Sequence, residues 1–297
     1  MKSCSDATVH PVNTNPWLDR RILNWAHQGG AKEAPSSTLF AMRAAIAAGA
    51  DALELDVHLS ADGVLMVCHD ATVDRTTDGT GAIANLTLDE LRRLDNAYWW
   101  VPGSVVDHDN DDLGAYIHRG RATDDPEFRI ATLDEVLDSF PDVFLNFDIK
   151  QTAPAVTSYE QPLAEALLRH DRVGDTIVAS FNDLATDRFR AIAPQIHTSL
   201  GTAGTADFYR AFRGGLEAPS TPSVALQVPR TFGDIVVVDE DFVAAAHRSG
   251  LAVHVWTIDD PEEMALLADI GVDAVMTDRP EALEGILQEK GFAYTNE

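Results

Sequence analysis

The feature that most constrains this chain is a regular alternation of short β-rich runs with helical stretches. We expect eight strands, at 22–27, 52–58, 143–150, 176–181, 196–200, 224–228, 251–258 and 274–277. Helices are expected between them, at 38–48, 164–169, 184–192, 208–213, 242–249, 262–270 and 281–289. Such alternation predicts parallel strands joined by right-handed crossovers. A closed α/β (β/α)₈ TIM barrel is the expected fold, and an open doubly wound sheet is the alternative.

Two segments interrupt this alternation. Residues 64–69 follow a turn at 61–63 and are expected to pair with the second strand as a hairpin. Residues 98–129 are rich in Asp, Gly and aromatic side chains and lack periodicity. We interpret them as a small insertion after the second strand, at about 98–130, that covers the active face; an inert surface loop is the alternative. The chain then divides into an N-terminal extension, 1–21, and one barrel domain, 22–297.

Charge and composition narrow the choice of partners. The chain carries 48 acidic and 22 basic residues, and its net charge of −26 argues against nucleic acid or an anionic membrane as a partner. No apolar run approaches the roughly 18 residues of a membrane span, and the first twenty residues hold no signal-peptide core. We therefore expect a cytoplasmic protein without stable membrane insertion. Its two cysteines form no disulfide framework, and its oligomeric state stays open.

Carboxylates and a lysine fall at the ends of two expected strands. Because side chains alternate across a strand, Glu54, Asp56 and His58 share one face of the second strand, and Asp148 and Lys150 share one face of the next. Paired carboxylates repel each other in a dry interior, and a divalent cation between them removes that cost. Oxygen ligands favour Mg²⁺ or Ca²⁺ over zinc. The alternative is ordinary salt bridging at the barrel mouth.

Two histidines are the candidates for acid–base catalysis. His27 ends the first strand, and His69 precedes Asp70, which can orient its imidazole. Histidine titrates near neutral pH, which suits proton transfer to and from phosphoester oxygens. His58 continues the face of Asp56 but can already lie beyond the pocket, so we leave it outside the catalytic set.

These residues lie in motifs that resemble the glycerophosphodiester phosphodiesterase family. The match runs from about Ile22 to the last helix, and its first block is the most specific. The blocks are, in chain order, Ala26-His27-Gln28-Gly29-Gly30, Glu33-Ala34-Pro35-Ser36-Ser37-Thr38, Gly49-Ala50-Asp51-Ala52-Leu53-Glu54-Leu55-Asp56-Val57, Val67-Cys68-His69-Asp70, Asp74-Arg75-Thr76-Thr77, Asn146-Phe147-Asp148-Ile149-Lys150, Ser180-Phe181, Val255-Trp256-Thr257 and Thr277-Asp278-Arg279-Pro280.

The resemblance implies a TIM barrel that hydrolyses small glycerophosphodiesters to glycerol 3-phosphate and an alcohol. It implies that His27 and His69 form the acid–base pair. It also implies that three carboxylates hold the divalent cation, Mg²⁺ or Ca²⁺, and that three further residues bind the substrate. The expected metal ligands are Glu54, Asp56 and Asp148, and the expected substrate-binding residues are Gln28, Lys150 and Trp256.

Three departures from the family pattern concern phosphate affinity and metal preference. Gln28 stands where the family usually has arginine, Ser36 and Ser37 replace a usual Glu-Asn pair, and Asp148 replaces the commoner glutamate. Two other functions remain open. One is a lysophospholipase D-like phosphodiesterase, for which the aromatic segment 98–102 can supply an apolar wall. The other is a catalytically silent binding protein.

Overall fold

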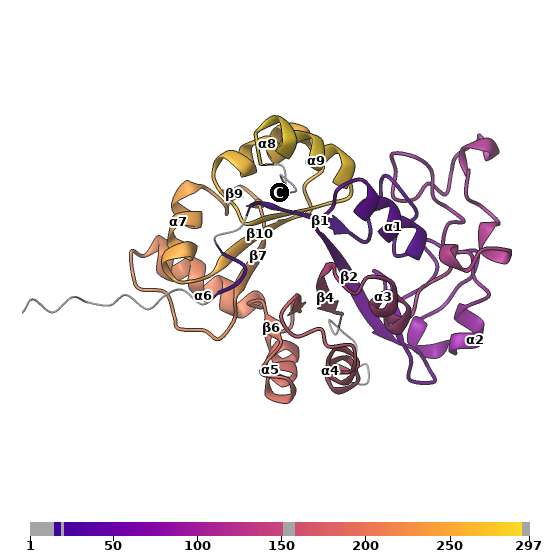
Figure 1. The fold of residues 1–297 in the computed structure, drawn as a ribbon, viewed down its shortest axis with the longest axis horizontal. Helices are drawn as coiled ribbons and strands as arrows, with labels where there is room; N and C mark the ends of the chain where they lie inside the picture. The colour runs from indigo at the N-terminus through magenta and orange to yellow at the C-terminus, as the bar shows by residue number, and fades with distance from the viewer. Residues whose placement is uncertain (1–14, 19–20, 151–157, 293–297) are drawn as a thin grey trace, which may run out of the picture.

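The barrel closes around eight parallel strands. The computed structural model describes residues 15–18, 21–150 and 158–292. In this part of the chain the strands follow the order β6-β5-β4-β2-β1-β11-β10-β7, and a parallel bridge between Ser199 and Ala225 joins the two ends of that order (Figure 1). The strands are β1 (Leu23–His27), β2 (Ala52–Leu59), β4 (Phe144–Ile149), β5 (Thr176–Ala179), β6 (His197–Thr198), β7 (Ala225–Pro229), β10 (Ala252–Trp256) and β11 (Ala274–Thr277). The closed barrel is confirmed, and the open sheet is excluded.

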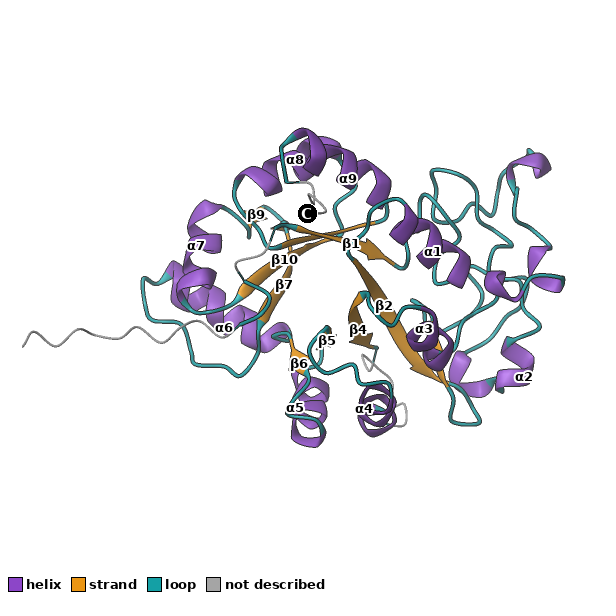
Figure 2. Ribbon diagram, viewed as in Figure 1, coloured by secondary structure: helices purple, strands orange, loops and turns teal. Residues whose placement is uncertain are grey.

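Helices form the outer layer of this barrel (Figure 2). They are α1 (Leu39–Ala47), α3 (Leu133–Ser139), α4 (Glu160–Arg169), α5 (Asp183–Ile192), α6 (Thr202–Arg213), α7 (Glu240–Arg248), α8 (Pro261–Asp269) and α9 (Pro280–Glu289). Asn182, Asp239 and Asp260 cap α5, α7 and α8 by accepting hydrogen bonds from first-turn N–H groups. None of the helices in the described ranges has the length and apolar character needed to cross a membrane.

The strands turn their apolar faces to the helices. On β2, Leu53, Leu55 and Val57 are fully buried in one core cluster that also holds side chains of α3 and α4. The intervening Glu54 and Asp56 therefore point to the inside of the barrel, as the alternation in the sequence predicts. This arrangement delivers the carboxylates to the barrel interior without interrupting the apolar layer outside.

The segment between β2 and α3 leaves the barrel and is longer than expected. It begins with β3 (Leu65–Val67), which pairs antiparallel with β2 as predicted, and continues through α2 (Leu88–Leu91) and short 3₁₀ turns. In Figure 1 it lies on the right, beside α1. Phe128 of this segment stacks on Phe40 of α1, with ring centroids 4.5 Å apart. The helices α2 and α3 were not among the expected elements.

Part of the expected N-terminal extension belongs to the barrel core. Residues 1–14 and 19–20 lie outside the described part of the chain, but Trp17 is only 1% exposed and packs against Trp25 and Phe144. Asn15 donates to the carbonyl groups of Val224 and Gly250, which precede β7 and β10. Trp17 therefore fills the end of the barrel at which the strands begin.

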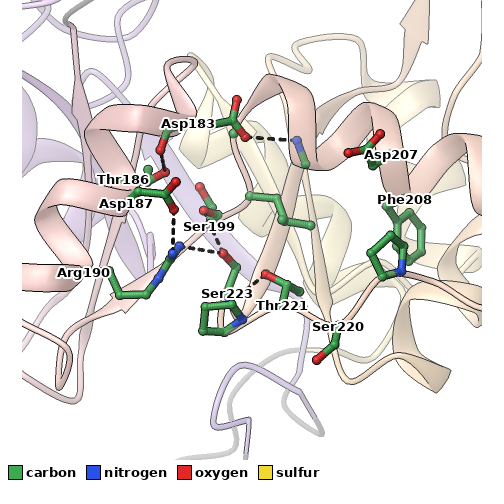
Figure 3. A pocket seen from close by; sticks show the side chains of 15 residues that line it. Asp183, Thr186, Asp187, Arg190, Ser199, Asp207, Phe208, Ser220, Thr221 and Ser223 are labelled. Carbon is green, nitrogen blue, oxygen red and sulfur yellow. Dashed lines mark hydrogen bonds and ion pairs between the residues drawn. The ribbon is translucent and has the colours of Figure 1, made fainter.

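Side chains reinforce the seam where the barrel closes. Strand β6 has two residues, and the Ser199–Ala225 bridge is the strand pairing that joins it to β7. Arg190 of α5 donates to Thr198 Oγ1 at 2.9 Å. It also donates to Ser223 Oγ at 3.1 Å, and Ser223 Oγ donates to the Ser199 carbonyl (Figure 3). These bonds connect β6 with the segment that leads into β7.

We expect Arg190→Ala to destabilise this seam. The substitution leaves Thr198 and Ser223 without their charged donor, which typically costs about 1.5–3 kcal/mol. Urea unfolding followed by circular dichroism measures the change in the free energy of unfolding. Arg93→Ala, at an exposed arginine, is the control and is expected to stay within about 0.5 kcal/mol of the parent. An equal, small effect of both substitutions would contradict the account of the seam.

Candidate active site

Polar side chains gather at the end of the barrel where the strands end. A cavity of about 700 Å³ opens there. In (β/α)₈ barrels this face carries the functional residues, because loops after every strand meet on it. Of the eight candidate residues from the sequence, the structure brings seven to the cavity wall: His27, Glu54, Asp56, His69, Asp148, Lys150 and Trp256. Gln28 lies beside His27 and is buried.

Strand register places the polar residues side by side. His27 of β1 is opposite Glu54 of β2, and Asp56 of β2 is opposite Asp148 of β4. Because the three strands are neighbours in the barrel, side chains that are more than a hundred residues apart in the sequence meet on one face. The site therefore follows from the alternation within each strand and from the order of the strands.

The rings of the two histidines lie close together at this end of the barrel, edge to face. Their ring centroids are 5.8 Å apart, and their planes are nearly perpendicular, at 84°. Each ring is held through Nδ1 by a carboxylate at 2.7 Å, His27 by Asp278 and His69 by Asp70. Since both Nδ1 atoms are engaged, both Nε2 atoms are left for the chemistry. This paired arrangement can accept a proton on one side of a substrate and donate one on the other.

Asp278 was not singled out by the sequence reasoning as a site residue. It lies just after β11, 251 residues from His27 in the chain, and its carboxylate is buried. Burial alone lowers the pKa of His27, but the hydrogen bond to Asp278 and the negative charges of Glu54 and Asp56 outweigh it and raise that pKa to about 9. The motif Thr277-Asp278-Arg279-Pro280 was the available signal, but the sequence could not show which residue Asp278 contacts.

We expect Asp278→Asn to lower both the pKa of His27 and the catalytic rate. The substitution keeps the shape of the side chain but removes the charge that stabilises the imidazolium, so the His27 pKa should fall from about 9 toward the ordinary value of 6.5. Histidine NMR titration of the metal-free protein measures this shift. We also expect kcat to fall at least about tenfold, because the ring loses the partner that orients it. An unchanged His27 titration would contradict the role given to Asp278.

Lys150 lies between two of the carboxylates. Its Nζ is 2.8 Å from Asp56 Oδ1 and 2.8 Å from Asp148 Oδ2. Burial raises the pKa of Asp56, but Lys150 and the two histidines outweigh this effect and lower it, while burial raises the pKa of Asp148. Burial and the neighbouring Asp56 charge raise the pKa of Glu54. The raised pKa values of Glu54 and Asp148 reflect the cost of placing several negative charges together in a buried place.

This carboxylate set has the chemistry of a site for a hard divalent cation. Among the described residues, Glu54 Oε2, Asp56 Oδ2 and Asp148 Oδ1 are buried without a hydrogen-bond partner, and oxygens of this kind are the ligands that Mg²⁺ and Ca²⁺ prefer. In the same part of the chain, no group of three or more His, Cys, Asp or Glu side chains converges as a preformed metal site. Lys150 occupies the gap, so a bound cation requires it to release at least one carboxylate.

Gln28 has an unusual backbone conformation next to Nε2 of His27. Its φ of +53° lies in the left-handed region, which residues with side chains rarely adopt. The conformation places Gln28 Nε2 3.2 Å from His27 Nε2, where the amide donates to a neutral imidazole. Gln28 Oε1 has no partner among the described residues, so rotation of the amide would let it accept from a protonated His27. Gln28 therefore contacts His27 in either charge state.

The insertion supports the loop that carries His69. His108 Nε2 lies 3.0 Å from the Arg75 carbonyl, and Trp99 donates to the Thr77 carbonyl. Arg75 in turn binds Asp70 through two hydrogen bonds, and Asp70 holds His69. Of the described residues, none in 98–129 lines the cavity. This segment lies beside the barrel because its aromatic side chains pack on α1 and on the His69 loop.

His58 has a supporting position. Its Nε2 lies 3.3 Å from the His69 carbonyl, its side chain is buried, and burial lowers its pKa. His58 is not among the described residues that line the cavity. Its exclusion from the catalytic set agrees with this position.

Comparisons with known proteins show which family this chain resembles. Residues 27–282 match the model of the glycerophosphoryl diester phosphodiesterase family. A glycerophosphodiester phosphodiesterase of Caldanaerobacter subterraneus is 29% identical over 273 residues, which cover 91% of this chain and all of the relative. Human glycerophosphodiester phosphodiesterase 1 is 48% identical over 77 residues, which cover 26% of this chain and 23% of the relative.

Solved structures share the fold. The glycerophosphoryl diester phosphodiesterase domain of a Mycobacterium tuberculosis protein superposes with a TM-score of 0.72 at 21% identity, covering 91% of this chain and all of that one. An Oleispira antarctica phosphodiesterase, solved in complex with the product sn-glycerol-3-phosphate, superposes with a TM-score of 0.63 at 24% identity. That match covers 89% of this chain and 96% of the other.

Proposed function

This chain belongs to the glycerophosphoryl diester phosphodiesterase family, and we propose that it hydrolyses glycerophosphodiesters to sn-glycerol 3-phosphate and an alcohol. The enzymes of this family are phosphoric diester hydrolases. The observation that carries the proposal is the pair of imidazoles, His27 and His69, each held through Nδ1 by a carboxylate beside three buried carboxylates and a lysine. This combination supplies proton transfer and charge stabilisation at one phosphate-sized position.

The two histidines carry the proton transfers in the proposed mechanism. One Nε2 accepts a proton from the attacking hydroxyl group or water, and the other donates a proton to the departing alkoxide. Asp278 and Asp70 hold the rings through Nδ1 and keep both Nε2 atoms directed at the substrate. Either histidine can be the acid, since both have the same kind of partner.

The remaining polar residues bind the substrate phosphate and its substituents. Lys150 offers a positive charge to a phosphate oxygen once it releases a carboxylate. Gln28 is one hydrogen bond from His27 Nε2, close enough for its amide to donate to a phosphate oxygen held there. Trp256 packs against the glycerol or the alcohol. These three residues are the proposed substrate-binding set.

Glu54, Asp56 and Asp148 would hold a divalent cation, Mg²⁺ or Ca²⁺. Such a cation, when bound, offsets the acidic surroundings and stabilises the negative charge that develops on the phosphoryl oxygens. The chain supports this assignment with carboxylate oxygens that are buried and have no hydrogen-bond partner within the described ranges. The sequence change from the family's usual glutamate to Asp148 shortens one ligand by a methylene group.

Choline release from glycerophosphocholine tests the proposal. We expect hydrolysis that stops with EDTA and returns when Mg²⁺ or Ca²⁺ is added in excess. Bis-p-nitrophenyl phosphate, a phosphodiester without glycerol, is the control substrate. Cleavage of the control but not of glycerophosphocholine would show that the protein hydrolyses phosphodiesters but that glycerophosphodiesters are not its substrates. Full activity in EDTA would contradict the proposed requirement for a metal ion.

A further inference from the structure

The half of the cavity that faces away from the histidines is apolar. Its wall comes from the ends of β5, β7 and β10, from α6 and from the segment after β7. Phe181 joins the two halves: its ring centroid is 5.6 Å from that of Trp256 and 5.8 Å from Lys150 Nζ. We call the set of six lining side chains the apolar wall: Phe181, Tyr209, Phe232, Ile235, Val237 and Trp256.

A short hairpin supplies the outer edge of the apolar wall. Strands β8 (Thr231–Phe232) and β9 (Ile235–Val236) pair antiparallel, with Phe232 directly opposite Ile235, so these two side chains lie on one face. Phe232 is 72% exposed and Ile235 is 47% exposed, although both line the cavity. Contiguous exposed apolar side chains beside a cavity mark a place where an apolar ligand or partner binds.

The hairpin is held in place by bonds other than the burial of these side chains. Arg213 of α6 donates to the Val236 carbonyl, and Val237 N donates to the Arg230 carbonyl. Arg230 also pairs with Glu263 of α8 at 2.7 Å. The hairpin therefore presents Phe232 and Ile235 toward the cavity from a backbone fixed to two helices. Their side chains are exposed although the hairpin itself is held in place.

We propose that the apolar wall binds the single hydrocarbon chain of a monoacyl or monoalkyl phosphodiester whose phosphate lies at the histidines. This inference rests on the proposed function and names a substrate class for the same site. Glycerol and choline groups are small and polar, and they leave the aliphatic part of the wall uncovered. A cavity of about 700 Å³ has room for a ligand larger than glycerophosphocholine alone.

The aromatic segment 98–102 does not provide this wall. Trp100 is buried and donates to the Ala31 carbonyl, and Trp99 donates to the Thr77 carbonyl. Neither lines the cavity among the described residues. The proposed chain-binding surface therefore comes from residues other than the aromatic segment 98–102.

Calorimetric binding of alkylphosphocholines in the presence of EDTA, which stops the proposed hydrolysis, tests the apolar wall independently of turnover. Hexyl-, octyl- and decylphosphocholine are used below the concentrations at which they form micelles. Each methylene that leaves water for an apolar site strengthens binding about fourfold when it is fully buried. Because the wall is partly open, we expect decylphosphocholine to bind at least about tenfold more tightly than hexylphosphocholine.

Paired variants locate the effect. In the double variant F232S/I235S we expect most of this chain-length dependence to disappear. Leu113→Ser, at a side chain that is 73% exposed in the insertion and outside the cavity wall, is the control and should keep it. Equal binding of all three ligands by the parent protein would overturn the inference, as would full chain-length dependence in F232S/I235S. Binding to phosphatidylcholine vesicles without any preference among the monomeric ligands would also overturn it, in favour of a membrane surface.

Turnover separates this inference from the proposed function. If the inference holds, kcat/KM for lysophosphatidylcholines rises with acyl length in parallel with the binding series. Hydrolysis of glycerophosphocholine with a flat binding series would keep the proposed function and overturn the apolar wall. Chain-length-dependent binding with no hydrolysis of any of these diesters would overturn the proposed function and keep the wall as a binding site.

Discussion

Replacing His27 or His69 by alanine is expected to lower kcat on glycerophosphocholine by about 10²–10⁴-fold at saturating metal. Each imidazole is held by a carboxylate at 2.7 Å, and the two rings face each other, so each variant removes one of the two proton-transfer groups. Because the imidazoles are proposed to act in the proton transfers, the loss should appear mainly in kcat.

A third histidine provides the control for these variants. His170 follows α4 and pairs with Asp134 and Asp138. His170→Ala is expected to stay within about twofold of the parent rate, because the side chain is not among the described residues that line the cavity. Steady-state kinetics of the three variants in parallel decides the matter. Near-parental turnover of both His27→Ala and His69→Ala would show that the acid–base pair lies elsewhere.

Asp56→Asn is expected to weaken Mg²⁺ or Ca²⁺ binding by about 100-fold or more, because affinity in such sites depends on the number of charged ligands. Asp56 is 1% exposed, and its Oδ2 has no hydrogen-bond partner in the described part of the chain. The amide keeps the size of the side chain but removes the negative charge that a cation needs. Calorimetric titration of the metal into EDTA-treated and dialysed protein measures the effect directly.

A control variant at a second acidic residue tests whether the loss of any negative charge weakens metal binding. Glu262 is exposed at the start of α8 and is not among the described residues that line the cavity, so Glu262→Gln removes one negative charge outside the site. We expect it to leave the metal affinity within about twofold, because solvent and salt screen distant surface charges. Thermal unfolding of Asp56→Asn, followed by circular dichroism, confirms that the variant is folded. Parental metal affinity in Asp56→Asn would contradict the role of the three carboxylates.

Alternation within a strand was sufficient to predict half of the site. On β2 the sequence separates Leu53, Leu55 and Val57 from Glu54 and Asp56, and the structure buries the first set under helices and lines the cavity with the second. This works because successive side chains of a strand point to opposite faces, which is a local rule. His27 and His69 were candidates because of their places beside expected strands and, for His69, the adjacent Asp70; the family resemblance added that they form an acid–base pair.

Long-range contacts were not available from the sequence. Asp278 meets His27 only because β11 and β1 are neighbours in the barrel, and no local pattern reports that pairing. The apolar wall shows the same limit. The sequence analysis considered only the aromatic residues at 98–102 as an apolar wall, and the fold instead brings Phe232 and Ile235 to the cavity.

The sequence also holds local signals for the starts of helices α2 and α3, which were not among the expected elements. Helix α3 begins with a capping box in which Thr132 and Glu135 bond each other's backbone N–H, and Thr87 and Glu90 do the same for α2. Both helices are short, and both lie in or next to a segment without hydrophobic periodicity. The extent of the insertion was therefore underestimated, although its place after the second strand was predicted.

Phosphorus NMR of a reaction with glycerophosphocholine tests the central claim most directly, because it shows which phosphorus species forms. The account predicts that the diester signal is replaced by the signal of authentic sn-glycerol 3-phosphate, that EDTA prevents the conversion and that excess Mg²⁺ or Ca²⁺ restores it. Formation of phosphocholine, or a diester signal that persists at every metal concentration, would contradict it.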